Sequence, residues 1–261
     1  EQEAEQGPEP RRSRAAYAYN GEQHQALWQR FLKRTKRHEA TFGHMVSGLM
    51  ERQRDSVLAR LRGKRDAPGA MLDPFDMADW IKRFREETRP TLTRILQEVG
   101  DDVLADMMLS LSFNVLDPRV IRFLESRAQR FAKQVNETTW RALQRSLAEG
   151  MQLSEGVPQL EERVLSIMAN RITSSAETIA RTEVLGAYNN GTWLASQEAQ
   201  DVVGPLNKTW LSALDDRTRT PANGDQFDHV AAHGETVPMM MPFMRTGEAR
   251  MAPHDAAGSA A

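Results

Sequence analysis

Residues 117–150 read DPRVIRFLESRAQRFAKQVNETTWRALQRSLAEG, and this stretch decides the fold class. Asp117 can cap a helix N-terminus, and Pro118 suits the first helical position because the amide hydrogen it lacks would be unpaired there. Apolar residues then recur every three or four positions until Gly150, which is typical of a helix with one buried face. The stretch therefore predicts one long amphipathic helix with apolar positions Val120, Ile121, Phe123, Leu124, Ala128, Phe131, Val135, Trp140, Leu143 and Leu147.

Helical patterns also lie on both sides of this stretch. Residues 25–63 predict a helix or a helix pair, and Asp73-Pro74 predicts the start of a helix that runs to about Val99. Residues 158–170 predict a shorter helix that ends in a turn. Ser174 and Glu177 have the spacing of a capping box, which predicts another helix to about Ala199.

The pattern changes after Asp201, where Gly, Pro, Asp and Asn become frequent and the helical period is lost. Lys208 to Leu214 alternates as a strand does, and residues 234–237 are expected to pair with it. We therefore expect a mainly α N-terminal body with long helices, followed by a small α+β C-terminal domain. The expected division is a disordered arm or linker at 1–20, a helical body at 21–172 and a small domain at 173–261, incomplete at its C-terminus.

Composition narrows the function classes. The 261 residues carry a net charge of −2 and no cysteine, which excludes a disulfide framework or a thiolate metal site within this sequence. No apolar run approaches the roughly 18–20 residues that a membrane span needs, so we expect no membrane association. Charge is uneven, because residues 28–65 hold eleven Lys and Arg residues against three acids.

This basic segment is a candidate contact surface. Its cations could neutralise phosphates without reading bases, or they could meet an acidic protein surface. The alternative is an ordinary solvated helix face. The candidate residues are Lys33, Arg34, Lys36, Arg37, Arg52, Arg54, Arg60, Arg62, Lys64 and Arg65.

The helix expected from residue 174 is polar in its middle, where it reads IARTEV at 179–184 and AYNNG at 187–191. At helical spacing Thr182, Gly186 and Asn190 form a stripe of small or polar groups on which a close neighbour could pack. Arg181 and Glu183 are either solvated surface charges or members of a polar cluster. Downstream follow KTWLSALDDRTR at 208–219 and then His229, His233 and Gly234.

This ordered set resembles the phage head-morphogenesis family, the Mu F-like minor capsid proteins. The resemblance covers about Phe123 to the end of the chain and is strongest from Ile179 to Gly234. It implies that the matching residues form a structural polar cluster, with no catalytic, cofactor-binding or metal-binding role. These residues are Arg181, Thr182, Glu183, Asn189, Trp210, Asp215, Asp216, Arg219, His229 and Gly234.

The resemblance also implies a function. Such a chain is expected to be a structural minor head protein of a tailed phage, present in several copies at the portal vertex, and not an enzyme. It would contribute to head assembly, DNA packaging or DNA ejection, in the host cytoplasm during assembly and then in the virion, in the head interior or at the portal vertex. Its expected partners are the portal protein, packaged double-stranded DNA and the major capsid or scaffold protein, and no cofactor is expected.

Two alternatives remain open. The chain could be a non-sequence-specific DNA-binding module of the virion. It could also be a metal-dependent hydrolase or nuclease, because His229, His233 and His254 lie in one short region with Asp225 and Asp228, and imidazole and carboxylate groups are metal ligands. No His-Glu-x-x-His helix, phosphate-binding glycine loop or Gly-x-Ser-x-Gly turn supports an enzyme.

Overall fold

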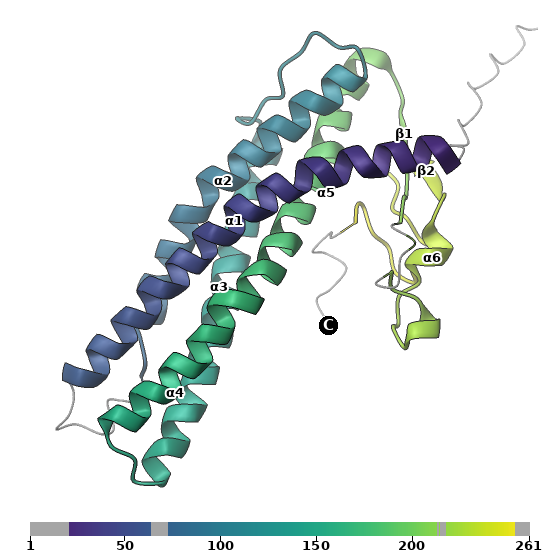
Figure 1. Cartoon of the computed structure of the whole chain (residues 1–261). Coiled ribbons are helices and arrows are strands. Elements are labelled where there is room, and N and C mark those ends of the chain that lie inside the picture. The colour runs from purple at the N-terminus through teal and green to yellow at the C-terminus, as the bar shows by residue number, and fades with distance from the viewer. Residues whose placement is uncertain (1–20, 64–72, 213, 215–217, 254–261) are drawn as a thin grey trace, which may run out of the picture.

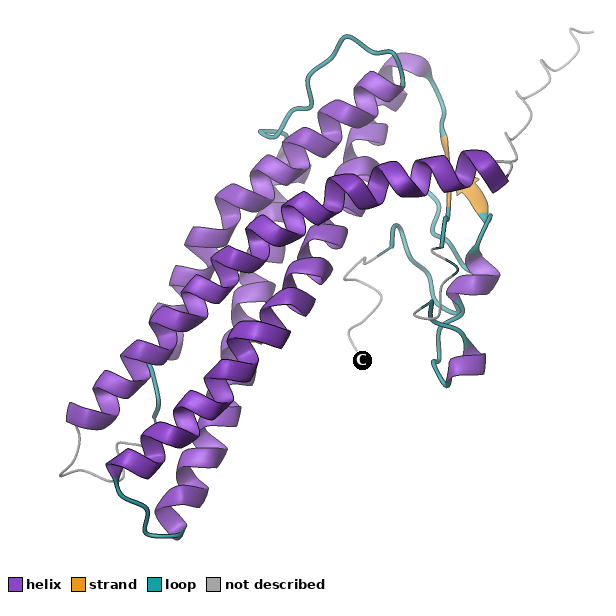
Figure 2. Ribbon diagram, viewed as in Figure 1, coloured by secondary structure: helices purple, strands orange, loops and turns teal. Residues whose placement is uncertain are grey.

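The computed structural model describes residues 21–63, 73–212, 214 and 218–253 (Figure 1). The expected arm at 1–20 lies outside the described residues. The described chain is mainly helical, with one small two-stranded sheet near the C-terminus (Figure 2), which confirms the expected fold class. None of the described helices combines the length and the low polarity that crossing a membrane requires.

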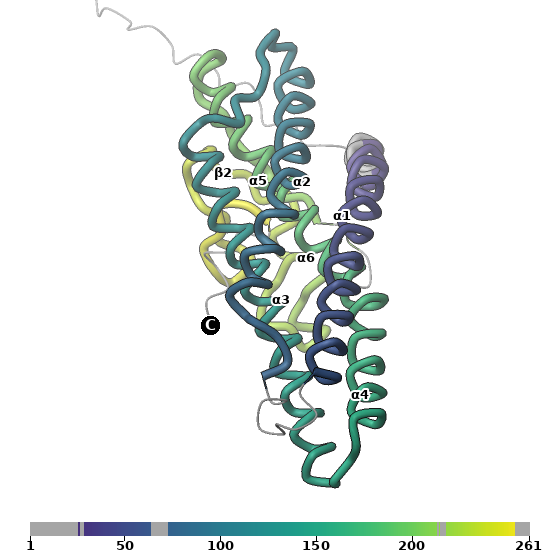
Figure 3. The backbone as a smooth tube through the Cα atoms, turned by 90° about the vertical axis from the view of Figure 1, so that its left-hand side faces the viewer, coloured from purple at the N-terminus to yellow at the C-terminus, as the bar shows by residue number. Residues whose placement is uncertain are grey.

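Five long helices form an elongated bundle, and its long axis is clear in Figures 1 and 3. Contacts between helices are most extensive where α5 packs on α2 and α1, and where α2 packs on α3. In chain order the helices are α1 (Gly21–Gly63), α2 (Met77–Asp106), α3 (Pro118–Gln152), α4 (Val157–Asn170) and α5 (Ala176–Val203).

The central helix is confirmed. The side chain of Asp117 accepts a hydrogen bond from the Arg119 backbone N–H at 2.7 Å, and Pro118 is the first residue of α3. Pro118 therefore costs no helical hydrogen bond, as expected at this position. The helix continues two residues past Gly150.

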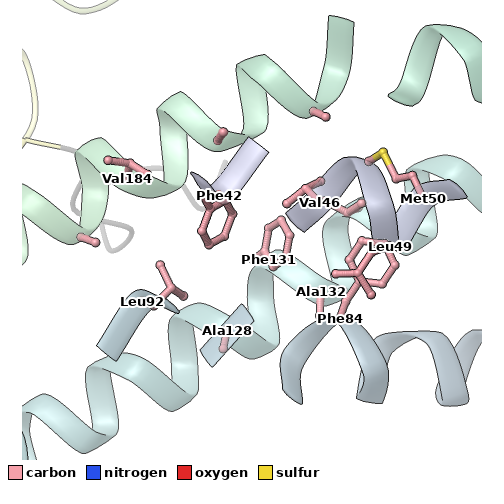
Figure 4. Close-up of a cluster of buried hydrophobic side chains, with 14 of the residues drawn as sticks. Phe42, Val46, Leu49, Met50, Phe84, Leu92, Ala128, Phe131, Ala132 and Val184 are labelled. Atoms are coloured by element: carbon pink, nitrogen blue, oxygen red, sulfur yellow. The ribbon is translucent and has the colours of Figure 1, made fainter. Parts of the chain in front are cut away.

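Aromatic and aliphatic side chains from the four longest helices fill one core (Figure 4). Phe42 of α1 lies edge-to-face against Phe131 of α3, with ring centroids 5.8 Å apart, and Phe84 of α2 lies 6.1 Å from Phe131. Val184 of α5 is fully buried in the same cluster. Because α5 shares this core, the boundary expected at residues 172–173 does not divide the packing. The helical body includes α5, and the compact segment begins near Gly204.

Residues 21–63 form a single helix of 43 residues, which is one of the two alternatives expected for this segment. Both boundaries of the next helix differ from the expected ones. The cap of α2 is Asp76, whose side chain accepts from the Asp79 N–H, because Asp73 instead pairs with Arg60 of α1 at 2.9 Å. Helix α2 also continues past Val99 to Asp106.

The junction of α4 and α5 is continuous. Residues 171–175 form a π-helical turn between them, so the expected turn near Asn170 is absent. Ser175 precedes α5 with helical φ and ψ and makes no side-chain cap, so the capping box predicted from Ser174 and Glu177 is wrong. The carbonyl groups of the continuous helical backbone accept the hydrogen bonds that a cap side chain would otherwise accept. The inserted turn also receives a contact from α1, because Ser47 Oγ donates to the Ile172 carbonyl at 3.0 Å.

The segment after Gly204 is small and compact. Strand β1 (Asn207–Thr209) pairs antiparallel with β2 (Thr236–Pro238), and Lys208 faces Val237. The strand expected at 208–214 is therefore shorter, although its pairing with residues near 234–237 is confirmed. Between the strands lie a 3-10 turn (Pro221–Asn223) and the short helix α6 (His229–Ala232). Trp210, Ala232 and Phe243 form a second apolar cluster.

Candidate functional site

A buried ion pair joins α3 to α5. Arg127 Nε donates to Glu183 Oε2 at 2.8 Å, and Arg127 Nη2 donates to the Thr182 carbonyl at 3.0 Å. The side chains are only 8% and 12% exposed. Burial raises the pKa of Glu183, and the positive charges of Arg127 and Arg130 oppose that rise. The paired arginine thus lets a motif carboxylate remain inside the bundle.

Gly186 leaves the space that this arginine occupies. A Cβ built on Gly186 would lie 2.1 Å from Arg127 Nη2 and 2.3 Å from Cζ, which no side-chain methyl can tolerate. The stripe of small residues predicted on this helix therefore does receive a close neighbour. Asn190, one turn later, is buried and donates from Nδ2 to the Gly186 carbonyl at 2.9 Å. We call Arg127, Glu183, Gly186 and Asn190 the arginine lock.

The other matching residues of α5 lie outside the lock. Arg181 has a side chain that is 48% exposed and lies 3.9 Å from Glu39 of α1. Thr182 is exposed, and its hydroxyl donates to the Thr178 carbonyl. Asn189 is half-buried, whereas its neighbour Asn190 is the buried amide. Arg181 thus fits the interpretation as a solvated surface charge. Glu183 does not, because its side chain is buried.

The matching residues after Gly204 build the compact segment. Trp210 is buried between the rings of His229 and Phe243, with centroid distances of 5.3 and 5.2 Å. Trp210 Nε1 donates to Ser212 Oγ at 3.0 Å, and Ser212 Oγ donates to the His229 carbonyl. The His229 ring is thus held by packing. Burial lowers its pKa, and the charges of Arg219 and Arg250 lower it further.

A carboxylate fixes the loop beyond β2. Glu235 is buried, and its two carboxylate oxygens accept the backbone N–H groups of Met244 and Arg245, each at 3.0 Å. Gly234 precedes it with φ +80°, a left-handed backbone that glycine adopts without steric cost. Sequence reasoning gave Glu235 no role, since its partners are backbone groups that no residue type reveals.

The described members of the single polar cluster that we expected do not come together. Glu183 faces Arg127 of α3 and Arg181 faces α1, whereas Arg219 lies 3.5 Å from Asp225 and over the ring of Phe227. The physical reason is that α5 belongs to the bundle core, while the later residues fold around Trp210. Asp215 and Asp216 lie outside the described residues.

Sequence reasoning missed two polar residues at the centre of the bundle. Arg127 was not identified, because it is 56 positions from Glu183. Gln53 was also missed. Its Nε2 donates to Asn136 Oδ1 at 2.7 Å, and both side chains are fully buried. In the sequence, each of these polar residues stands at a position where the helical period predicts an apolar one. This indicates that the side chain has a buried hydrogen-bond partner, but it does not identify the partner.

Most of the basic candidates of α1 are neutralised. Arg54 pairs with its neighbour Asp55, and five other arginines pair with carboxylates of other segments. Such pairs lower the net charge of this helix, although each exposed pair contributes only about 0–1 kcal/mol. Lys33 and Lys36 are exposed and have no ion-pair partner among the described residues, and Lys64 and Arg65 lie outside them. The pairs are Arg34–Asp102, Arg37–Glu98, Arg52–Glu87, Arg60–Asp73 and Arg62–Glu161.

The candidate metal ligands are used in other ways. His233 Nδ1 accepts the Ser212 N–H at 3.2 Å, and Asp228 caps α6 by accepting from the Ala231 N–H at 2.8 Å. Within the described ranges, no three His, Asp or Glu side chains gather in a geometry that could hold a metal ion. His254 lies outside those ranges.

Comparisons with protein-family models, with curated proteins and with solved structures find no match to this chain. The candidate site is therefore interpreted from its own contacts. The α3–α5 lock and the Trp210 segment are positioned to hold the fold together.

Proposed function

We propose that this chain is a structural minor head protein of a tailed phage, which associates with the portal vertex and contributes to head assembly, DNA packaging or DNA ejection. The arginine lock is the observation that carries the proposal. Glu183, a residue of the ordered set that resembles the Mu F-like minor capsid proteins, is buried against Arg127 and joins two helices. A carboxylate in that position is used to join the two helices, as a structural role requires.

The compact segment adds support. Trp210, His229 and Gly234 belong to the same ordered set, and their rings and backbone build the second apolar cluster. Two parts of the resemblance are thus used for packing at two separate places in the chain. This pattern favours a scaffold over an enzyme whose motif residues converge on a cleft.

The shape of the chain suits an assembly role. Helix α1 alone has 43 residues, which at 1.5 Å per residue corresponds to roughly 65 Å. A long bundle with a small compact segment can contact two neighbours far apart, such as the portal and the packaged DNA or capsid interior.

The test is co-expression with the portal protein encoded in the same phage genome. A tagged chain should retain the portal through purification at moderate salt, and electron microscopy of heads should show its density at one vertex. The Arg181→Ala variant serves as a control that should still retain the portal, because Arg181 is half-exposed and lies outside the lock. Uniform distribution over the capsid, or recovery of the chain without portal, would contradict the proposal.

A further inference from the structure

One end of the bundle carries an apolar patch with acidic neighbours. The loop between α2 and α3 and the last turn of α5 both lie there, as Figures 1 and 3 agree. The Asn114 N–H, 3.4 Å from Glu198 Oε2, connects the two segments. We call this end the bundle tip and define it by its five exposed apolar residues, Met108, Leu111, Leu116, Val202 and Val203.

The exposure at the tip is selective. Phe113 is buried and Met107, Leu109 and Val115 pack against the core, while Met108 is 92% exposed and Leu116 is 76% exposed. Single exposed apolar residues are ordinary on a protein surface. A group of exposed apolar side chains that two segments supply at one end of the molecule is unusual, and such patches mark contact sites.

Charge indicates what covers the patch. Asp106 and Asp201, at the ends of α2 and α5, are exposed and form no ion pair within 4 Å in the part of the chain that the structure describes, although the charge of Asp201 also acts on Arg119, which pairs with Asp117. The same chain carries a face of opposite charge. Arg30, Lys33 and Lys36 of α1 are exposed at spacings of three residues and likewise have no described ion-pair partner. We call these three residues the α1 cation face.

We propose that the bundle tip of one copy binds the α1 cation face of a second copy of this chain. Lysine and arginine suit this patch, because their aliphatic stems can cover apolar side chains while their charged ends reach the carboxylates. The two surfaces differ, so the contact is head-to-tail, and a pair keeps one free cation face on one copy and one free tip on the other. Such contacts close into rings when the rotation between copies permits. The inference deepens the proposed function, because it names the contact by which several copies would surround a portal.

Sedimentation of the purified chain alone tests the contact without the portal. The wild-type chain should form larger species as its concentration rises. Met108→Gly should weaken this association by about tenfold or more, since burial of one methionine side chain contributes that much. Met108 already has a left-handed backbone, φ 58°, which glycine adopts freely, so this variant should keep its thermal stability.

Charge exchange identifies the partner surface. A tip variant with Asp106→Lys and Asp201→Lys, and a face variant with Lys33→Glu and Lys36→Glu, should each be monomeric. Mixing the two should restore association, because the unaltered tip of the face variant can bind the unaltered face of the tip variant, and each new cation can also meet a new carboxylate. Retained circular dichroism shows that each variant is folded.

Three results would overturn the inference. They are a wild-type chain that stays monomeric at all concentrations, exchanged variants that associate as well as wild type, and tip variants that lose portal binding while self-association persists. The last result would assign the tip to the portal and leave the proposed function intact. Failure of the portal co-purification with normal self-association would instead refute the proposed function alone.

Discussion

Replacing Arg127 with alanine should destabilise the whole bundle. The change removes hydrogen bonds to Glu183 Oε2 and to the Thr182 carbonyl, and it leaves Glu183, whose side chain is 12% exposed in the intact bundle, without its partner. Removing one member of a buried ion pair costs about 3–5 kcal/mol of unfolding free energy, because the remaining charge is still desolvated. Stability of a domain is about 5–15 kcal/mol, so this loss is large.

The pH dependence gives the effect a second signature. Burial raises the pKa of Glu183, and Arg127 opposes it, so the folded-state pKa should rise further in the variant. A carboxyl with a raised folded pKa contributes stability fully below its ordinary value near 4.5, and that contribution is lost as pH rises through the folded value. The deficit of Arg127→Ala relative to wild type should therefore grow as pH rises above about 4.5.

Urea denaturation of four proteins measures the pair directly. These are wild type, Arg127→Ala, Glu183→Gln and the double variant. The double variant should lose less than the sum of the two single variants, since glutamine carries no charge to strand. A loss below about 1 kcal/mol for Arg127→Ala at neutral pH, or strict additivity in the cycle, would show that the pair does not hold α3 to α5.

Three further changes test other contacts. Gly186→Ala should lower the free energy of unfolding by roughly 1–3 kcal/mol in urea denaturation, because the new methyl group displaces the Arg127 guanidinium. Gly48→Ala is the control: its new Cβ would lie 3.7 Å from the nearest atom, Arg52 Nη1, and should raise the free energy of unfolding by roughly 0.5–1 kcal/mol. Glu235→Gln should speed proteolysis of the loop after β2, because one of two N–H groups loses its acceptor. Burial lowers the pKa of His38, which lies 3.2 Å from Glu98. The contribution of neutral His38 to folding stability is therefore complete above pH 6.5, and it is lost as pH falls through the folded-state pKa. A His38→Gln variant should show a smaller stability change from pH 7 to about pH 5 in the same assay.

Local signals were sufficient for most of the fold. Asp117-Pro118 predicted the start of α3, because a cap and a proline act within one turn and need no distant partner. The pairing of residues near 208 and 237 followed from alternation and turn residues. Asp73-Pro74 has the same local form but failed, since Arg60 of another helix binds Asp73 and the next aspartate, Asp76, caps α2.

Long-range partners account for the rest. The stripe around Gly186 indicated a close neighbour, yet nothing local could identify that neighbour as Arg127. A helical period also cannot show whether α4 and α5 are separate, because the π-helical turn between them adds residues without a break in the backbone. The predicted polar cluster failed for the same reason. It required α5 to pack with the later segment, whereas its apolar residues match α1 and α2 better.

The pairing of arginines on α1 bears on the choice between DNA and protein as the partner of this helix. A surface that binds DNA through phosphates needs cations free of internal carboxylates, because each pair must break before its arginine can neutralise a phosphate. Arg34 and Arg37 are committed to α2, and Arg62 makes two hydrogen bonds to Glu161 of α4. The charge of α1 thus serves mainly to attach it to the bundle, and the cations that remain are grouped near its start. A short cation face of this kind matches a small acidic patch on a protein better than it matches the continuous charge of a duplex.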